Sequence, residues 1–235
     1  MEYPVGLDRC FSFINCQLQP ASRAVPYGDT GGHRTAVTIS RQAGCGALVV
    51  AEKLAARLQA HSQRGTPPWT VFDRNLIEQV LADHNLPARL AKYLPEDRMT
   101  ELQDITDELF GLHPPSWTIV RQTAETMLRL AELGSVILIG RGANIVTARL
   151  PNVFHVRLVA PLEKRIEHAH EFYEMTKVAA RRFCKNQDLG RKRYLNKYFD
   201  ADVDDPLLYH LTINTGLVSY EQAARLIADA VLAAS

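Results

Sequence analysis

The sequence carries almost no net charge, and this limits the partners that it can attract. Its 235 residues include 27 lysines and arginines and 26 aspartates and glutamates, so the formal net charge is only +1. A balance this close provides no overall electrostatic field that would draw the chain to nucleic acid or to a membrane surface. Any site for an anion must therefore be built locally, from a few residues.

Long apolar runs and paired cysteines are also missing. The longest apolar runs, such as Val136–Ile139, are far shorter than the roughly 20 residues of a membrane-spanning helix. The N-terminus has no basic segment followed by an apolar one, which a secretion signal requires. The four cysteines are widely spaced and form no C-x-x-C pair, which is typical of a reducing compartment. We therefore expect a cytoplasmic protein that does not bind membranes.

Two regions of different character divide the chain. Residues 1–34 contain prolines and glycines among polar residues and show no sustained periodicity, so we expect a flexible N-terminal appendage. Residues 35–235 contain apolar runs that alternate with helix-like patterns, which predicts one domain with an α/β fold.

Five strand-like runs indicate the type of sheet. They lie at residues 36–40, 69–72, 136–139, 153–159 and 211–213. The third run, Val136–Ile139, is apolar on both faces, which is typical of a central strand in a parallel sheet with helices on both sides. The alternation predicts a doubly wound, five-stranded parallel sheet whose ligands bind at the carboxyl ends of the strands.

The first strand-like run leads into a glycine turn and then into a helix. Gly44 and Gly46 let the backbone curl, so that consecutive N–H groups point into one concavity at the start of the helix. This arrangement predicts a phosphate-binding loop made of Gly44, Cys45, Gly46, Ala47 and Leu48. Such a turn is also common in α/β proteins that bind nothing there, so the two glycines alone leave both interpretations open.

Three residues of this loop depart from the full signature G-x-x-x-x-G-K-[ST]. Arg41 stands at the position of the first glycine, Ala47 at that of the lysine, and Leu48 at that of the hydroxyl that binds magnesium. The pattern therefore predicts the shape of a phosphate-binding loop without its usual side-chain chemistry.

Two further residues follow strand-like runs at the expected ligand edge. Arg141 stands between Gly140 and Gly142, which leave its guanidinium room to hold a phosphate with two parallel hydrogen bonds. Asp73 follows the second run. The alternatives are a surface arginine in a loop and, for Asp73, the N-cap of the next helix.

A basic segment follows the fourth run. Lysines and arginines gather between residues 165 and 197, and on a helix Arg181, Lys185 and Asp188 would share one face, so some of these charges pair with each other. A concentration of arginines suits phosphoryl transfer, in which positive charge surrounds the moving group as a lid closes. The same segment suits RNA binding less well, because few aromatic rings accompany it.

Several short motifs occur together in a fixed order after the glycine turn. They are Gly140-Arg141-Gly142-Ala143, Ala160-Pro161-x-x-x-Arg165, Asp188-x-x-Arg191 and Tyr209-x-Leu211-x-Ile213-Asn214-Thr215. In this order and spacing the chain resembles the cytidylate kinase-like family, a nucleoside monophosphate kinase branch of the P-loop NTPases. The resemblance covers about residues 35–231.

The resemblance implies an architecture and a set of site residues. It implies a helical acceptor insert at about 73–115 and a basic lid at about 175–200. Residues 44–48 would bind the donor phosphates, and Arg141 would hold the acceptor phosphate with Asp73 near it. By the same resemblance the residues that act on the transferring group are Arg41, in place of the missing lysine, and Arg165, Arg181 and Arg191.

The function implied is a kinase that transfers the γ-phosphoryl group of ATP to a nucleoside monophosphate or a related small acceptor, with Mg2+. No magnesium ligand is identifiable, because Gly140 follows the central strand-like run without a carboxylate. Gly142 and His210 stand where this family usually has acidic residues, so base preference is open. The alternative is an inactive nucleotide-binding pseudokinase that acts as a sensor or partner-binding module, and an RNA-binding protein is a weaker third. The oligomeric state has no signal in the sequence.

Overall fold

The structure is a computed structural model, and it describes residues 34–62, 66–73, 102, 104–106, 109, 118–140 and 142–234. All but the last residue of the expected N-terminal appendage, and nearly all of the expected acceptor insert, lie outside these residues. Arg141 lies outside them as well.

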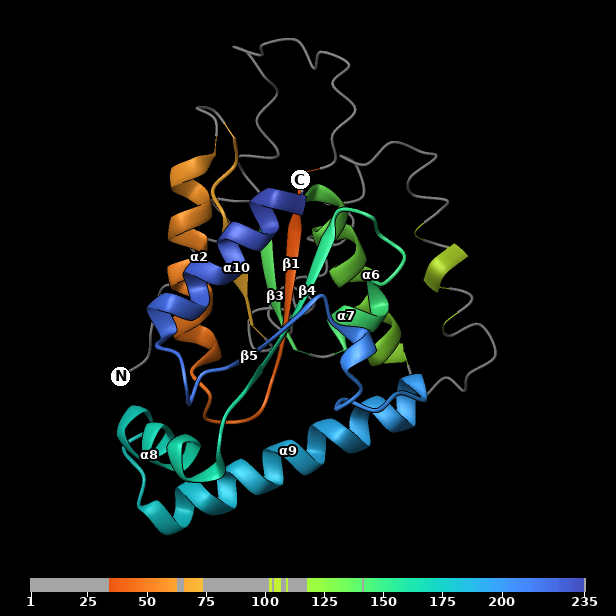
Figure 1. The fold of residues 1–235 in the computed structure, drawn as a ribbon. Coiled ribbons are helices and arrows are strands. Elements are labelled where there is room, and N and C mark those ends of the chain that lie inside the picture. The colour runs from red at the N-terminus through yellow and green to blue at the C-terminus, as the bar shows by residue number, and fades with distance from the viewer. Residues whose placement is uncertain are drawn as a thin grey trace.

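The described core is a five-stranded sheet, and all of its strand pairs are parallel (Figure 1). The strand order is β2-β3-β1-β4-β5. The bounds are β1 Ala36–Arg41, β2 Thr70–Phe72, β3 Val136–Ile139, β4 Val153–Val159 and β5 Leu211–Asn214. The predicted doubly wound parallel sheet is confirmed, and the predicted strand ends differ from the observed ones by at most one residue.

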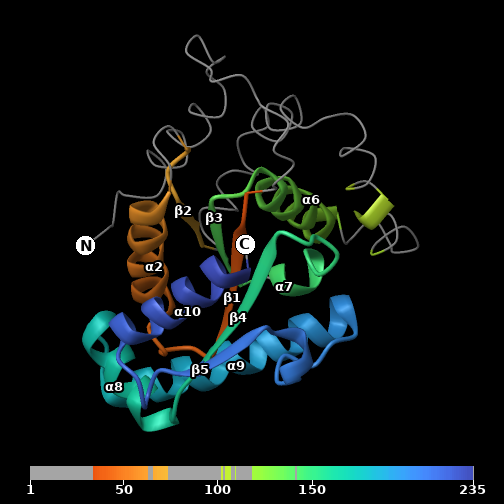
Figure 2. The ribbon, with the colours of Figure 1, turned by 45° about the horizontal axis from the view of Figure 1, so that its top comes forward.

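Helices cover both faces of the sheet (Figures 1 and 2). On one face α2 (Ala47–His61) and α10 (Tyr220–Ala234) pack together, and on the other lie α6 (Thr118–Leu133) and α7 (Ala143–Val146). Burial on both sides explains why every residue of β3 is apolar and buried. No described helix has the length and apolar character needed to cross a membrane.

Strand β4 carries two buried polar side chains, and each has a hydrogen-bond partner. The ring Nδ1 of His155 lies 2.8 Å from the hydroxyl of Thr38 on β1. Arg157 donates to Ser40 Oγ at 2.9 Å and to Asp204 Oδ1 at 2.7 Å. Because each group has a partner, their burial is tolerated.

Two helices lie at the carboxyl edge of the sheet. α8 (Leu162–Phe172) follows β4, and α9 (Lys177–Phe199) then runs past the ends of the strands toward α7 (Figure 1). A short 3-10 helix, η2 (Pro206–Leu208), connects to β5. This edge is where doubly wound sheets bind ligands, so α9 covers the expected site.

Candidate functional site

The turn between β1 and α2 has a backbone that only glycine fits. Gly44 and Gly46 have φ angles of 81° and 74°, in the left-handed region. A Cβ on Gly44 would overlap the backbone carbonyl of Arg165, and one on Gly46 would overlap the ring of Tyr220. Both glycines are therefore required by backbone conformation and by close packing.

Consecutive backbone N–H groups in this turn are unpaired. Ala43 N–H donates to Asp188 Oδ1 and Val50 N–H donates to the carbonyl of Gly46, but the N–H groups of residues 44–49 have no acceptor among the described residues. They lie at the start of α2, a helix of 15 residues whose dipole adds partial positive charge. Unpaired N–H groups at a helix start favour an anion, which supports the predicted phosphate-binding role of residues 44–48.

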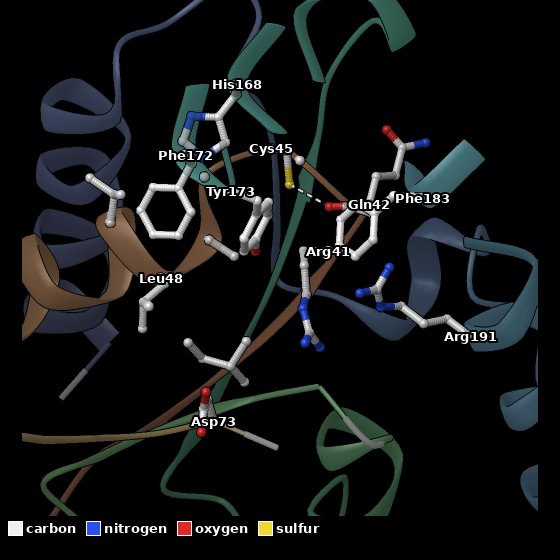
Figure 3. Close-up of a pocket in the computed structure, with 16 residues that line it drawn as sticks. Arg41, Gln42, Cys45, Leu48, Asp73, His168, Phe172, Tyr173, Phe183 and Arg191 are labelled. Carbon is white, nitrogen blue, oxygen red and sulfur yellow. Dashed lines mark hydrogen bonds between the residues drawn. The ribbon is translucent and has the colours of Figure 1, made fainter. Parts of the chain in front are cut away.

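A pocket opens in front of this turn, and its walls differ in character (Figure 3). Besides residues 42–49, one part of the lining carries the guanidinium groups of Arg41 and Arg191. Another part is aromatic. The described aromatic lining residues are His168 and Phe172 of α8, Tyr173, and Phe183 of α9.

Arg41 is the last residue of β1, and its side chain lines the first pocket. Its guanidinium packs over Gly140, where any Cβ would overlap it. Among the described residues no hydrogen-bond acceptor or ion pair reaches this guanidinium. Burial, and then the nearby charge of Arg191, lower the pKa of Arg41 to about 10. Arg41 therefore stays a cation at neutral pH, in a place that an anion would stabilise.

A second pocket shares these two arginines with the first. Arg41 and Arg191 line both pockets, and Figure 3 shows the guanidinium of Arg191 directed toward Arg41. The remaining lining is mostly neutral and polar. It consists of Ser40, Gly140, Gly142, Asn144, Asn186, Gln187, Gly190, Tyr194, Leu195 and Val203.

Asp188 ties α9 to the turn. Its carboxylate accepts from the N–H of Ala43 at 2.7 Å, from Nη1 of Arg165 at 2.5 Å and from Nη1 of Arg191 at 3.2 Å. Arg165 also donates to the carbonyls of Ala43 and Ala160. This network connects the turn, α8 and α9, and it positions Arg191 beside Arg41.

Some of the predicted site residues line the first pocket, and others lie outside both pockets. Arg41, Arg191, Asp73 and residues 44–48 all line the first pocket. Arg165 is buried in the Asp188 network and lines neither pocket, which gives it a positioning role. Arg181 also lines neither pocket. It forms an ion pair with Glu163 at 2.7 Å on the exposed side of α9, with 47% of its side chain exposed.

Cys45 is the one predicted loop residue whose side chain is turned away from solvent. Its thiol is buried and donates to the carbonyl of Gln42 at 2.9 Å. Burial raises the pKa of this thiol to about 12, so it stays protonated. Its contribution to an anion site therefore comes from its backbone N–H.

Two features of the pockets were missed in the sequence. The aromatic part of the first pocket has a signal there, because His168 and Phe172 are four residues apart and share a face of α8, with ring centroids 5.4 Å apart. The second feature has no such signal. Asn144 is 5% exposed and lines the second pocket, and no described residue forms a hydrogen bond with its Nδ2.

In a standard phosphate-binding loop a hydroxyl holds Mg2+ beside the nucleotide phosphates. Mg2+ prefers oxygen ligands in an octahedral arrangement. Leu48 places an apolar side chain, 38% exposed, where the loop hydroxyl would stand. Asp73 supplies the only carboxylate in the described lining of the first pocket, and the described residues contain no group of three or more potential metal ligands. The donor set of the loop does not fit this ion.

The chain is similar to several known proteins in sequence or in structure. The sequence profile of the cytidylate kinase-like family matches residues 36–217. The structure is similar to that of an uncharacterized protein from Eubacterium ventriosum, with a TM-score of 0.58 and 20% identity over 85% of this chain and 99% of that one. Shikimate kinase from Acinetobacter baumannii in complex with shikimate aligns with a TM-score of 0.41 and 13% identity, over 85% and 94% of the two chains.

One curated relative matches only in part. The uronate isomerase of Corynebacterium glutamicum is 28% identical over 111 residues, which are 47% of this chain. The matched segment spans 21% of the length of that isomerase.

Proposed function

Because the chain belongs to the cytidylate kinase-like family, we propose that it transfers the γ-phosphoryl group of ATP to a nucleoside monophosphate or a related small phosphorylated acceptor. The parallel sheet and the glycine turn at its carboxyl edge support this proposal. The identity of donor and acceptor is part of the proposal.

This proposal depends on the observation that the two pockets share two cationic side chains. In direct phosphoryl transfer the donor and the acceptor approach the moving group from opposite sides, and positive charge must surround its equatorial oxygens. Arg41 and Arg191 line both pockets, so a group passing from one pocket to the other would pass them. Guanidinium groups held in place there would stabilise the charge of the transition state.

The first pocket suits the donor. The unpaired N–H groups of residues 44–49 would bind its phosphates, with Arg41 in the role of the missing lysine. The aromatic residues His168, Phe172 and Tyr173 would contact a planar base, because aromatic rings stack on one another. Cationic and aromatic groups in one pocket therefore favour a nucleotide over an inorganic polyphosphate.

The second pocket suits the acceptor. Its two arginines would bind the acceptor phosphate, and the amides of Asn144, Asn186 and Gln187 both donate and accept hydrogen bonds. A molecule with a phosphate at one end and hydroxyl or carbonyl groups at the other matches this lining. Arg141 stays a predicted acceptor contact, whereas Asp73 lines the first pocket, which this proposal assigns to the donor.

The direct test is an assay of phosphoryl transfer. Purified full-length chain is incubated with labelled ATP, Mg2+ and each of a panel of nucleoside monophosphates and sugar phosphates. We expect one class of acceptor to be labelled, and Arg41→Gln to lower kcat by about 100-fold, the effect of losing one preorganised donor. The matched control is Arg182→Gln, which removes the same charge from an exposed position of α9 that lines neither pocket. Labelling no greater than that of a heat-killed sample would reject the proposal.

The second candidate is a pseudokinase that binds a nucleotide without turnover. Ala47 and Leu48 favour it, because the loop lacks the lysine and the hydroxyl that assist transfer. Titration calorimetry with ATP, alongside the labelling assay, separates the two functions. Binding without labelling of any acceptor supports the pseudokinase, and labelling of an acceptor excludes it.

A further inference from the structure

We propose that Arg41 and Arg191 together replace both the lysine and the magnesium ion of an ordinary phosphate-binding loop, so that nucleotide phosphates bind this loop without needing Mg2+. This inference rests on the proposed function in one respect, which is that a nucleotide occupies the first pocket. It concerns how the charge of that nucleotide is balanced.

The loop itself provides too little positive charge for a nucleotide. A standard loop contributes a lysine that reaches the β- and γ-phosphates and a hydroxyl that holds Mg2+. Here those positions are Ala47 and Leu48, and the side chain of Leu48 is partly exposed in the pocket. The backbone N–H groups add only partial charges. The balancing charge must therefore come from side chains outside residues 44–48.

Arg41 meets this need because its charge is not already used. No described residue accepts a hydrogen bond from its guanidinium, and the residue is only partly exposed. Gly140 leaves the space that this guanidinium occupies, since a Cβ there would overlap it. A partly buried cation that lines a pocket and has no partner among the described residues is stabilised by an anion.

Arg191 supplies the second charge from a different element. It shares Asp188 with Arg165, so one carboxylate serves two guanidinium groups and a net positive charge remains. Burial, and then the positive charge of Arg191, lower the pKa of Arg41, which means that the two cations repel each other. An anion bound between them removes that repulsion, and the planar guanidinium groups suit phosphate oxygens.

This arrangement predicts a specific response to Mg2+. When Mg2+ binds ADP in solution, it neutralises part of the phosphate charge. A site made of arginines therefore binds free ADP at least as tightly as it binds the magnesium complex, whereas a site that holds the ion itself binds the complex more tightly.

Titration calorimetry of the full-length chain with ADP, in EDTA and in excess Mg2+, tests the inference. We expect the wild-type Kd in EDTA to be equal to or lower than that in Mg2+. Arg41→Gln and Arg191→Gln should each weaken binding in EDTA by at least about tenfold, the cost of losing a charged hydrogen-bond donor. Arg182→Gln on the exposed side of α9 should leave the Kd unchanged.

A variant that should make ADP binding depend on Mg2+ provides a second measurement. Leu48→Thr returns the missing hydroxyl to the start of α2, so Mg2+ should now tighten ADP binding, which it does not do in the wild type. Thermal unfolding of each variant shows that its fold is intact. The comparison of the wild type in the two buffers needs no variant at all.

The outcomes separate this inference from the proposed function. If the wild type binds ADP at least tenfold more tightly in Mg2+ than in EDTA, the inference is wrong. It is also wrong if the Arg41 and Arg191 variants bind ADP as well as the wild type. Both results count against the inference even if the labelling assay succeeds. Magnesium-independent binding without transfer to any acceptor upholds the inference and rejects the kinase activity. No ADP binding in either buffer rejects both.

Discussion

Replacing Asp188 by alanine should destabilise the protein, because this carboxylate joins three parts of the site. It accepts from the N–H of Ala43, from Arg165 and from Arg191. Leaving the Ala43 N–H without a partner costs about 1–3 kcal/mol. Removing one partner of a buried ion pair costs about 3–5 kcal/mol.

The two costs do not add in full. The side chain of Asp188 is 29% exposed, and Arg165 keeps two carbonyl acceptors after the substitution. We therefore expect the free energy of unfolding to fall by about 3 kcal/mol, which is less than the sum of about 4–8 kcal/mol that the two full costs would give. For a chain of this length such a loss lowers the Tm by about 6–12 °C.

Urea denaturation followed by circular dichroism measures this loss, and an exposed ion pair is the control. Glu163→Ala removes the partner of Arg181 where the two side chains are 69% and 47% exposed. An exposed pair contributes less than about 1 kcal/mol. If Asp188→Ala costs no more than Glu163→Ala, the idea that Asp188 anchors α9 to the turn is wrong.

Three further predictions concern packing, protonation and the donor base. Gly46→Ala forces a Cβ into the ring of Tyr220 and should destabilise the protein by more than about 2 kcal/mol. Gly190→Ala in α9, where a Cβ meets nothing within 4 Å, should instead stabilise the protein by about 0.5–1 kcal/mol. The midpoints of urea denaturation compare the two variants. Burial lowers the pKa of His155 from 6.5 to about 4, so the unfolded chain takes up the proton first as the pH falls. The free energy of unfolding should therefore decrease by up to ~3 kcal/mol between about pH 6.5 and about pH 4. His155→Asn should reduce the dependence of the free energy of unfolding on pH in this range. An unchanged pH dependence would mean that other groups cause it. Phe172→Leu should weaken ADP binding by about tenfold and leave tripolyphosphate binding unchanged, since base stacking contributes about 1–3 kcal/mol; equal effects on both ligands would count against base stacking.

The arrangement of the elements could be predicted from the sequence because it depends on local patterns. Val136–Ile139 is apolar throughout because both faces of β3 are covered, and a strand of this kind can be recognised without its neighbours. Gly44 and Gly46 could be identified for a similar reason, since a sharp turn before a helix needs positive φ angles. The lost loop chemistry was also visible, because Ala47 and Leu48 stand at defined positions.

The composition of the site was decided by tertiary contacts. Arg165, Arg181 and Arg191 are equivalent in a basic segment of sequence, but the fold buries the first, exposes the second and directs only the third into both pockets. Arg41 and Arg191 are 150 residues apart, and they meet because Asp188 ties α9 to the turn after β1. Periodicity shows which face of a helix is polar, whereas the choice among charges on that face depends on what packs against it. The sequence by itself therefore determined the sheet and the turn, and only the packing of α8 and α9 across the sheet edge decided which charges face the pockets.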